Sequence, residues 1–383
     1  MIAPTPFFAD RGCHKRIYEE ARELQHRGHQ VVICTYHLGR DMEGIQTERI
    51  INIPWYKKLE AGPSWHKFYL DLLLFLKALR VSLREKPDIF HGHLHEGALI
   101  AKILGWIFRR PMVFDAQGSL VAELQDHGFI SEKGVLFRFF LWLEKLVYRL
   151  SDRIIISSHQ AHRLIRKKFA LPEEKALPIV DGVNLDTFKS AYSFKGLKKK
   201  WKLPLRKKIV IYVGILNHYQ GAEYIIASLK HLLAMRKDVH FLIIGFPQQP
   251  YQKLAEEEGL KNYLTFTGRI PYTEVPRYYC LAQVAISPKL SISEANGKLL
   301  EYMAMGLPSV VFDSQVSREI LGELGFYAKM RDAFSFAQQI DSALRLQEEN
   351  GDLKERLRKR AEELFSWESR VKEILSIYHS LNK

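Results

Sequence analysis

The chain has 383 residues, of which 47% are hydrophobic and 26% are charged, and its formal net charge is +14. The length exceeds that of one hydrophobic core and predicts two domains, and the composition excludes long disordered regions. The positive charge indicates an anionic partner. Nucleic acid is the weakest candidate, because the basic clusters lack the interleaved glycines and aromatics of nucleic-acid-binding modules. The remaining candidates are a phosphorylated substrate and an anionic membrane surface.

The cysteines and the N-terminal residues bear on localisation. Cys13, Cys34 and Cys280 lie far apart in the sequence, so neither a disulfide framework nor a zinc knuckle is expected, which suits a reducing cytoplasm. The segment MIAPTPFFADRG has no charged start followed by a long apolar core, so we expect no signal peptide. These features favour a cytoplasmic protein.

Helical segments alternate with short β-branched runs along the chain. In the helix predicted over 16–27, Ile17, Ala21 and Leu24 form one apolar stripe. Continuous apolar runs between helices are typical of parallel sheets covered on both faces. Because the pattern runs twice, we predict an α/β protein with two doubly wound parallel-sheet domains. The predicted strands are 31–35, 88–90, 112–115 and 153–157, then 209–214, 239–245, 264–266, 284–287 and 309–312.

Two longer apolar runs, 68–81 and 135–150, need a separate interpretation. Charged residues interrupt both runs, and neither reaches the roughly 20 uncharged residues that span a bilayer. We predict that they are buried core helices. The alternative is that they lie on the inner face of the cell membrane, because Lys and Arg flank their large aromatic residues.

Three histidines alternate in the stretch HGHLHEG, residues 91–97. On a continuing strand His91, His93 and His95 would share one face, as a metal site could require. The sequence marks no distal fourth ligand, so we expect no metal here. We expect instead that His93 or His95 lines a ligand cleft at the end of a strand.

The segment 288–312, PKLSISEANGKLLEYMAMGLPSVVF, combines a turn, a short helix and a strand. Asn296 and Gly297 permit the turn, and a helix is predicted over 298–305. The helix start favours a phosphate, and Lys298 adds a full positive charge. Glu301 could accept hydrogen bonds from a diol such as ribose; the alternative is an ion pair with Lys298 at i, i+3.

The stretch NGKLLEYMAMGLPSVV resembles the nucleotide-sugar site of family 4 glycosyltransferases. Further stretches agree in order along the chain, among them RELQHRGHQVVICT, PDIFHGHLHEGALIA, SDRIIISSHQAH, DGVNLDTF, YVGILNHYQGAEYIIASL and FTGRIPYTEVPRYY. The resemblance implies a GT-B fold, in which two Rossmann-like domains face across a cleft. It also implies a retaining hexosyltransferase that needs no cofactor and uses a UDP-, GDP- or ADP-sugar, with a glycan or lipid-linked acceptor.

The same resemblance implies a role for each matching residue. Glu301 would bind the ribose, Gly297 and Lys298 the diphosphate, and the main chain of Arg269 and Ile270 would flank the base. Gly12 resembles the glycine loop that closes over the sugar phosphate. The complete expected set is Gly12, Gly214, Gln220, Arg269, Ile270, Ser293, Asn296, Gly297, Lys298, Leu299 and Glu301 for the nucleotide sugar, His14, Lys15, His93 and His95 on the acceptor side, and Glu294 and Gln117 as catalytic residues.

The sequence departs from the family pattern at several positions. The family often has two glutamates eight positions apart, but counting back from Glu301 reaches Ser293 rather than Glu294. The first strand is nearly absent, because Met1 is followed at once by IAPTP, and a start upstream is one alternative. Gln117 stands where a histidine is common, and glutamine cannot take a proton near neutral pH.

A fourth departure concerns the diphosphate. Many family members place Arg and Lys after the first strand of the second domain, where this chain has Ile215 and Gln220. We expect the missing charge to come from Lys298, Lys289 and Arg269. The alternative function is a catalytically inactive GT-B protein that binds nucleotide or glycan, whereas an oxidoreductase is disfavoured because neither opening strand is followed by GxGxxG.

The domain boundary is expected in the basic stretch 186–207, which contains Gly196 and Pro204. Residues 1–185 would form the acceptor-side domain and residues 186–360 the nucleotide-sugar-binding domain. By the resemblance, residues 361–383 would form a helix that crosses back to the first domain.

Overall fold

The computed structural model describes residues 1–59, 62, 64–126, 129–131, 134–189, 192–291, 295–349 and 351–381. These residues form two compact units. The first consists mainly of residues 1–181 and of the C-terminal segment that begins at Trp367, and the second mainly of residues 182–291 and 296–366. Both are α/β units with parallel sheets, and each is described separately.

The first unit is built on a seven-stranded sheet with the order β3-β2-β1-β4-β5-β6-β7. Every pair is parallel. The strands are β1 Ile2–Ala3, β2 Val32–Thr35, β3 Gln46–Arg49, β4 Phe90–His93, β5 Met112–Ala116, β6 Arg153–Ile156 and β7 Ala176–Pro178, and the helices are α1 Gly12–His26, α2 Lys67–Glu85, α3 Leu94–Phe108, α4 Leu120–Asp126, α5 Val135–Leu150, α6 His159–Phe169 and α15 Trp367–Leu381.

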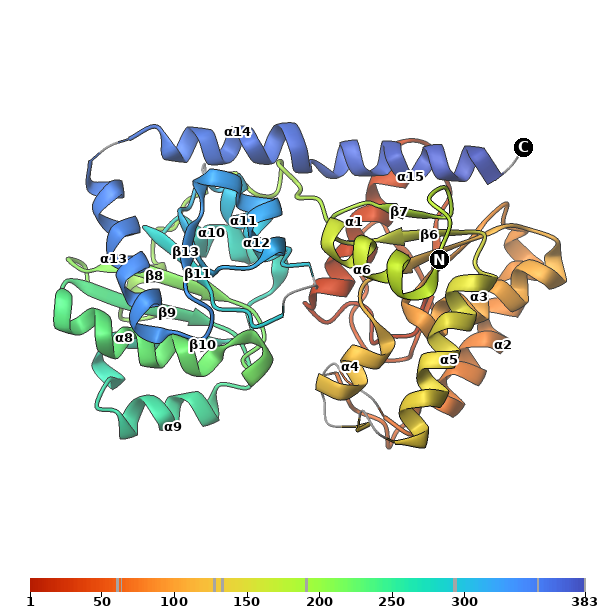
Figure 1. Cartoon of the computed structure of the whole chain (residues 1–383), viewed down its shortest axis with the longest axis horizontal. Coiled ribbons are helices and arrows are strands. Elements are labelled where there is room, and N and C mark those ends of the chain that lie inside the picture. The colour runs from red at the N-terminus through yellow and green to blue at the C-terminus, as the bar shows by residue number, and fades with distance from the viewer. Residues whose placement is uncertain are drawn as a thin grey trace. The chain divides into compact units, whose positions relative to one another are not determined.

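The two faces of this sheet differ in chemistry. On one face Phe90 of β4 and Phe114 of β5 join a hydrophobic core with residues of α2 and α3. Because side chains alternate along a strand, His91, His93 and Asp115 lie on the opposite face. There α1 and α15 pack against each other, as Figure 1 shows for the first unit. One face is therefore apolar and the other carries buried polar groups.

The second unit has a six-stranded parallel sheet with the order β10-β9-β8-β11-β12-β13. Its strands are β8 Lys208–Val213, β9 Val239–Ile244, β10 Leu264–Gly268, β11 Val284–Ser287, β12 Ser309–Phe312 and β13 Phe326–Ala328. Its helices are α7 Leu197–Lys200, α8 Ala222–Met235, α9 Gln249–Glu257, α10 Val275–Tyr279, α11 Lys298–Ala304, α12 Gln315–Leu321, α13 Ala333–Glu348 and α14 Leu353–Phe365, with 3₁₀ turns η1 His218–Gln220, η2 Lys261–Tyr263, η3 Tyr272–Glu274 and η4 Gly322–Leu324.

Every strand predicted from an apolar run is present, which confirms the α/β prediction. The sequence did not predict β3, β7 and β13, which lie at sheet edges and are short. The first strand, β1, has only two residues but occupies a central position, because Ile2 pairs with both Cys34 of β2 and Gly92 of β4. The predicted helix 16–27 begins earlier, at Gly12.

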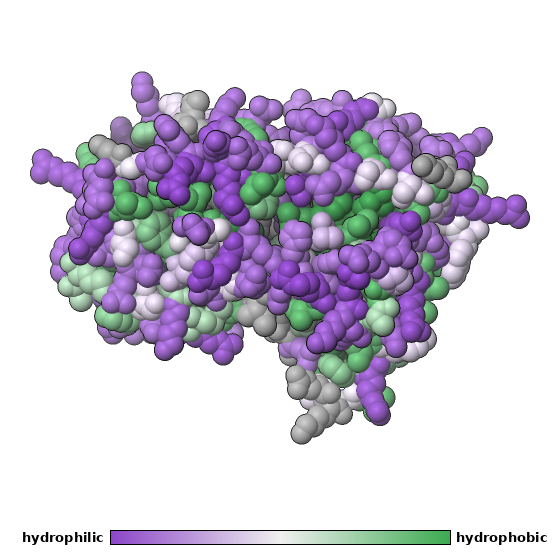
Figure 2. All heavy atoms as spheres, turned by 45° about the horizontal axis from the view of Figure 1, so that its top comes forward, coloured by the Kyte–Doolittle hydropathy of each residue, from purple (hydrophilic) through white to green (hydrophobic). Residues whose placement is uncertain are grey.

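Hydrophilic side chains cover much of the face seen in Figure 2, with smaller hydrophobic patches between them. In the described parts of the chain, no helix combines the length and apolarity needed to cross a membrane.

The buried His240 imidazole of β9 predicts a loss of stability in acid. Burial, with a smaller effect of Lys207, lowers the pKa of His240 to about 4, whereas an unfolded histidine titrates near about 6.5. Below about pH 6.5 the unfolded chain therefore binds a proton that the folded chain excludes. The contribution of His240 to the free energy of unfolding should fall by up to about 1.4 kcal/mol per pH unit until about pH 4.

Urea unfolding of the second unit between neutral pH and pH 5 measures this slope. His240→Gln retains a polar partner for Thr265, whose hydroxyl lies 2.8 Å from His240 Nε2, but cannot titrate, so the slope should decrease. The exposed His231→Gln is the matched control and should keep the wild-type slope. An unchanged slope in His240→Gln would contradict the assignment.

Candidate functional site

The candidate site of the second unit lies where four neighbouring strands end. Gly214 follows β8, Phe246 follows β9 after one residue, Arg269 follows β10, and Lys289 follows β11 after one residue. Because the strands are parallel, their carboxyl ends meet at one edge of the sheet, which is the usual ligand edge of open α/β sheets. Sequence reasoning had selected Gly214, Arg269 and Lys289.

Lys298, the first residue of α11, extends to this edge. Its Nζ donates to Gln220 Oε1 at 3.1 Å and lies 4.4 Å from the centre of the Tyr212 ring. A Cβ at Gly214 would lie 2.8 Å from the same Nζ, and the φ of Gly214 is +150°. The absence of a side chain at position 214 therefore gives the lysine its place beside the end of β8.

The loop after β8 packs closely on the segment after β11. Gly221 has a φ of +70°, and a Cβ there would lie 2.0 Å from the carbonyl oxygen of Pro288. The Leu290 amide donates to the Tyr219 carbonyl oxygen at 3.1 Å, and Lys289 Nζ lies 5.4 Å from the Tyr219 ring centre. These contacts bring the cations of Lys289 and Lys298 to the same loop.

Arg269 lies beside the end of β9 rather than beside this loop. Its guanidinium is stacked 3.4 Å from the centre of the Phe246 ring. The side chain of Arg269 is exposed, and the following Ile270 is half-buried. The flat, positively charged guanidinium of Arg269 therefore lies next to the half-buried aliphatic side chain of Ile270.

Glu301 lies one turn into α11 and is only 4% exposed. Its Oε2 accepts a hydrogen bond from the Tyr279 hydroxyl at 2.7 Å. Burial, followed by the Glu301 charge, raises the pKa of Tyr279 well above its usual value, so this hydroxyl remains a donor. Tyr279, which sequence reasoning missed, thus fixes one oxygen of Glu301.

The turn before α11 is ordered by Asn296. The buried Asn296 side chain donates to Ser287 Oγ at 3.0 Å, and the main-chain carbonyl oxygen of Asn296 accepts from the Leu299 amide at 2.9 Å. Leu299 is fully buried and anchors the helix, and Gly297 lies directly before α11. Ser293 and Glu294, the two candidates for the sugar side, lie outside the described residues.

In the first unit, the His14 imidazole lies in the interior and contacts polar groups through both ring nitrogens. It is fully buried, its Nδ1 accepts from the Ala9 amide at 2.8 Å, and its Nε2 lies 2.6 Å from Thr5 Oγ1. Since Nδ1 is an acceptor, the proton of the neutral ring is on Nε2. Burial lowers the pKa of His14, so the ring is neutral near pH 7. Lys15 is half-buried, and a Cβ at Gly12 would meet open space.

Gln117 belongs to a hydrogen-bond network centred on Asp115. Asp115 Oδ2 accepts from Gln117 Nε2 at 2.8 Å and lies 3.0 Å from His93 Nδ1, and Arg16 Nε lies 3.0 Å from both carboxylate oxygens. Although burial disfavours the charge of Asp115, Arg16 and His93 hold the pKa of this carboxyl below its usual value. Asp115 therefore remains ionised and orients the Gln117 amide.

The histidine run does not share one face as expected. Strand β4 ends at His93 and α3 begins at Leu94, so the alternation stops before His95. His91 and His93 are stacked with ring centres 4.5 Å apart, whereas His95 packs against the Phe114 ring at 5.0 Å. A shared face required a continuing strand, and that condition is not met for His95. All three imidazoles are buried.

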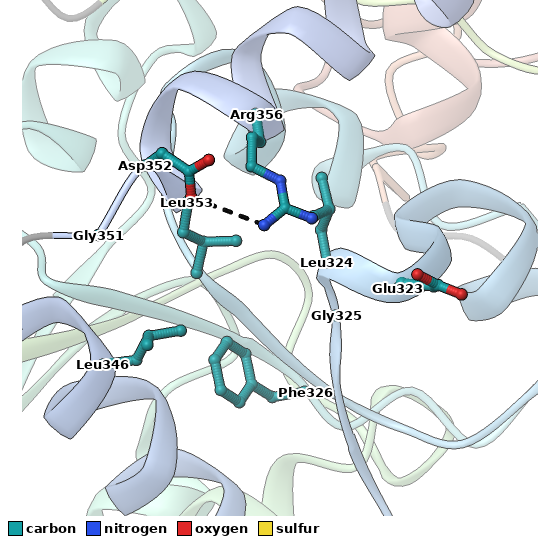
Figure 3. A pocket seen from close by; sticks show the side chains of 9 residues that line it. All are labelled: Glu323, Leu324, Gly325, Phe326, Leu346, Gly351, Asp352, Leu353 and Arg356. Atoms are coloured by element: carbon teal, nitrogen blue, oxygen red, sulfur yellow. Dashed lines mark ion pairs between the residues drawn. The ribbon is translucent and has the colours of Figure 1, made fainter.

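A separate surface pocket of about 290 Å³ lies in the second unit beside the start of α14 (Figure 3). Arg356 and Asp352 form an ion pair of 3.6 Å at its rim. The lining residues are Glu323, Leu324, Gly325, Phe326, Leu346, Gly351, Asp352, Leu353 and Arg356. None of the residues selected from the sequence lines this pocket.

Comparison with known proteins supports this arrangement. The description "Glycosyl transferase 4-like domain" matches residues 11–180, and "Glycosyl transferases group 1" matches residues 193–363. Over 371 residues, the chain is 23% identical to an uncharacterized glycosyltransferase of Methanocaldococcus jannaschii, covering 94% of this chain and 91% of that protein.

Two solved structures share the fold over almost the whole chain. The sucrose-phosphate synthase of Thermosynechococcus elongatus matches with a TM-score of 0.81 and 20% identity, covering 99% of this chain and 98% of that one. An Anabaena protein in complex with UDP and glucose matches with a TM-score of 0.79 and 16% identity, again covering 99% and 98%. The two parallel-sheet units thus define a GT-B fold. The chain belongs to the group 1 glycosyltransferases of the family 4 type and is a glycosyltransferase.

Gly214→Ala tests the position of Lys298. The new Cβ would displace Nζ from its place beside Tyr212, so we expect UDP or another nucleoside diphosphate to bind about tenfold more weakly, a cost of roughly 1.4 kcal/mol. Isothermal titration measures the change. Gly259→Ala also replaces a glycine at positive φ, but in open space, and should leave the affinity unchanged. Equal effects of the two variants would contradict the steric argument.

Proposed function

We propose that this glycosyltransferase transfers a hexose from a nucleotide sugar to a glycan or lipid-linked acceptor with retention of the anomeric configuration. The observation that carries the proposal is the pairing of Lys298 and Glu301 on α11 at the ligand edge of the second sheet. One group suits the diphosphate, and the other suits a diol.

Charge supports a diphosphate at the end of β8. Lys298 and Lys289 both lie against the loop 214–221, where this chain has Ile215 and Gln220 at the positions for which the family resemblance implies Arg and Lys. A group held in place before the reaction stabilises the charge that develops on the leaving diphosphate without a cost of reorganisation. The Anabaena structure contains UDP and glucose, and an Arabidopsis starch synthase of the same fold contains ADP, so both nucleotides are suitable donors to test.

Glu301 suits the ribose because a carboxylate offers acceptor oxygens and Tyr279 holds one of them, Oε2, in a fixed direction. Ribose hydroxyls are donors of matching chemistry. Because Glu301 is buried, a hydrogen bond to it forms in a medium of low dielectric constant and is stronger than in water.

Gln117 supports a positioning role in the first unit. Its Nε2 is engaged by Asp115, so its Oε1 is directed to accept from another donor such as a sugar hydroxyl. An amide takes no proton near neutral pH, and the proposed mechanism therefore assigns acceptor deprotonation to the departing diphosphate. The protein then contributes positioning and charge stabilisation.

Glu301→Ala tests the nucleotide assignment. We expect nucleotide-sugar affinity to fall at least about 100-fold, or roughly 3 kcal/mol, because the bound ribose would lose its charged acceptor. Tyr279→Phe should cause a smaller loss, since it removes only the group that orients Oε2.

The measurement is titration with a panel of UDP-, GDP- and ADP-sugars, and the exposed Glu257→Ala is the control. Similar affinities in Glu301→Ala and in the control would reject the assignment. Binding without release of nucleoside diphosphate, in the presence of candidate acceptors, would favour the inactive nucleotide- or glycan-binding alternative.

The outer face of α5 supports a lipid-linked acceptor. Phe139 and Trp142 are 51% and 57% exposed, and their rings are in contact. The acidic residue of this helix, Glu144, is buried. The exposed residues are apolar or basic: Val135, Leu136, Arg138, Phe139, Trp142, Lys145 and Arg149. Aromatic residues beside cations suit the interface of an anionic bilayer.

The neighbouring α2 has a similar face. Leu70 and Leu74 are buried in the core, as predicted for this run, but Phe68, Leu72 and Leu76 are exposed. The exposed charged residues of α2, Arg80 and Arg84, are basic. The two helices flank α3. We therefore place the membrane-facing surface of the first unit on the outer faces of α2 and α5.

Phe139→Ser combined with Trp142→Ser should weaken binding to vesicles that contain anionic lipid. Lys145→Gln with Arg149→Gln should weaken binding to anionic vesicles by about 2 kcal/mol but leave binding to neutral ones unchanged, because each cation contributes about 1 kcal/mol. Vesicle sedimentation gives both affinities. Leu205→Ser removes a 78% exposed apolar side chain from the second unit and is the control. Equal binding by all variants would reject this surface.

A further inference from the structure

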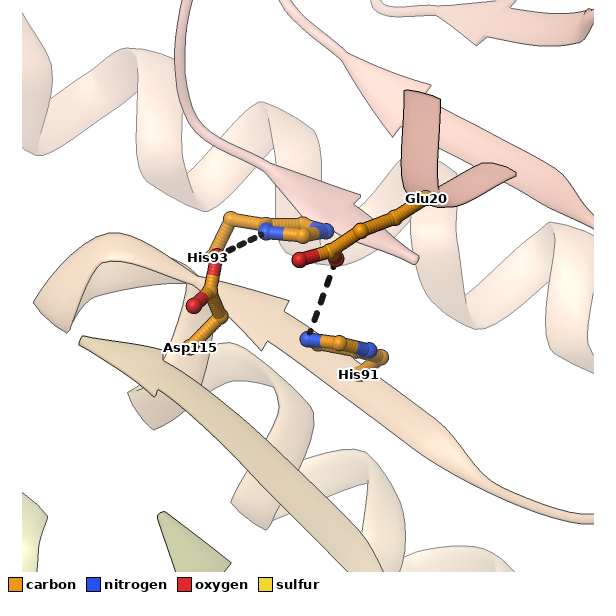
Figure 4. Close-up of side chains that lie close together, drawn as sticks. All are labelled: Glu20, His91, His93 and Asp115. Atoms are coloured by element: carbon orange, nitrogen blue, oxygen red, sulfur yellow. Dashed lines mark hydrogen bonds and ion pairs between the residues drawn. The ribbon is translucent and has the colours of Figure 1, made fainter. Parts of the chain in front are cut away.

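Four polar side chains meet in the interior of the first unit, outside the nucleotide site. Glu20 comes from α1, His91 and His93 from β4, and Asp115 from β5, and none of them is more than 2% exposed. One ligand atom of each lies within 4.8 Å of the ligand atoms of the other three. Figure 4 shows the Glu20 carboxylate beside the two imidazoles.

The outer nitrogens of both imidazoles are already held. His93 Nδ1 lies 3.0 Å from Asp115 Oδ2, and His91 Nδ1 lies 2.5 Å from the Tyr378 hydroxyl of α15. A hydrogen bond from His93 Nδ1 to Asp115 Oδ2 leaves the Nε2 lone pair of His93 available. This carboxylate–histidine arrangement is the one that orients metal-binding histidines.

The inner atoms have no hydrogen-bond partner in the part of the chain that the structure describes. They are Nε2 of His91, Nε2 of His93 and both carboxylate oxygens of Glu20, of which Oε1 also forms an ion pair with Arg16 Nε at 3.0 Å. His91 Nε2 and Glu20 Oε2 are 3.9 Å apart, too far for a hydrogen bond. Buried polar atoms are rarely left unpaired, so this set of two imidazole nitrogens and one carboxylate points to a missing partner.

The charges around the cluster favour a cation as that partner. The Arg16 guanidinium lies 3.0 Å from Glu20 and Asp115 and 2.7 Å from Asp181. One guanidinium thus faces three carboxyl groups. A divalent ion bound beside Glu20 would place a second cation among these carboxyl groups.

We propose that Glu20, His91 and His93 bind a divalent transition-metal ion of the Zn²⁺ class, with Asp115 and Tyr378 as outer-shell partners. Two imidazole nitrogens and a carboxylate form a known zinc donor set. Zinc bonds of about 2.0–2.2 Å require the donors to close by roughly an ångström. The stacked imidazoles, inclined by 16°, must turn toward the ion as it binds.

The proposed ion is structural. The donors are enclosed, so the ion has no route to a substrate. It joins α1 to the central strand β4, and through Tyr378 it links both to α15. From the sequence, only the histidines can be recognised as candidate metal ligands, because Glu20 and Asp115 lie far from them in the chain.

The test uses the full-length protein after EDTA treatment and dialysis. Titration with Zn²⁺ and with Co²⁺ should show one ion bound per chain with high affinity. Bound Co²⁺ should give an absorption band typical of Co²⁺ with few ligands. The Tm should be higher with Zn²⁺ but not with Mg²⁺. Each of these readouts is independent of transferase activity.

Glu20→Gln keeps the size of the side chain and removes one donor, so it should lose the Co²⁺ band and the Zn²⁺-dependent rise in Tm. Tyr378→Phe removes only an outer-shell hydroxyl and should lower Zn²⁺ affinity about tenfold. His26→Gln, at a 63% exposed position, controls for binding by surface histidines and should match the wild type. No tight ion in the wild type, or an equal Zn²⁺ effect in Glu20→Gln, would overturn the proposal.

Discussion

The parallel direction of the strands is the constraint on which both units depend. Because parallel neighbours are joined by crossovers, the carboxyl ends of all strands in a sheet emerge at the same edge. In the second unit this edge gathers Gly214, Arg269 and Lys289 from separate parts of the sequence. The short helix α11 then needs to supply only Lys298 and Glu301. The candidate donor site is thus a product of topology, to which a few side chains give its chemistry.

The same constraint explains which elements the sequence predicts. Central parallel strands are buried on both faces and require continuous apolar runs, such as KIVIYV in β8 and VHFLII in β9. Edge strands have no such requirement: β3 reads QTER, and β7 and β13 have three residues each. The sequence therefore identified the longer central strands and the edge strand β10, and it missed β3, β7 and β13 together with the two-residue central strand β1.

The residues of the candidate site could likewise be predicted only in part. Glu301, Lys298 and Gln117 were found because they belong to local motifs. Their partners Tyr279 and Tyr212 were not, because these contacts join residues distant in the chain. Asp115 stands only two residues before Gln117, but no spacing marks it as the partner. His95 does not share a face with His91 and His93 for a local reason, the end of β4. The assignments of individual residues to donor and acceptor stay predictions.

The packing of α15 also has a consequence for synthesis of the chain. Tyr378 bonds to His91, and the Arg16 guanidinium lies 5.9 Å from the Trp367 ring centre, so the first unit takes part of its interior from the last helix. A ribosome releases residues 1–181 long before it makes α15. In the nascent first unit, the polar face that α15 later covers must therefore stay uncovered while the whole second unit is translated. The two units differ in folding order, and the one that is made first is completed last.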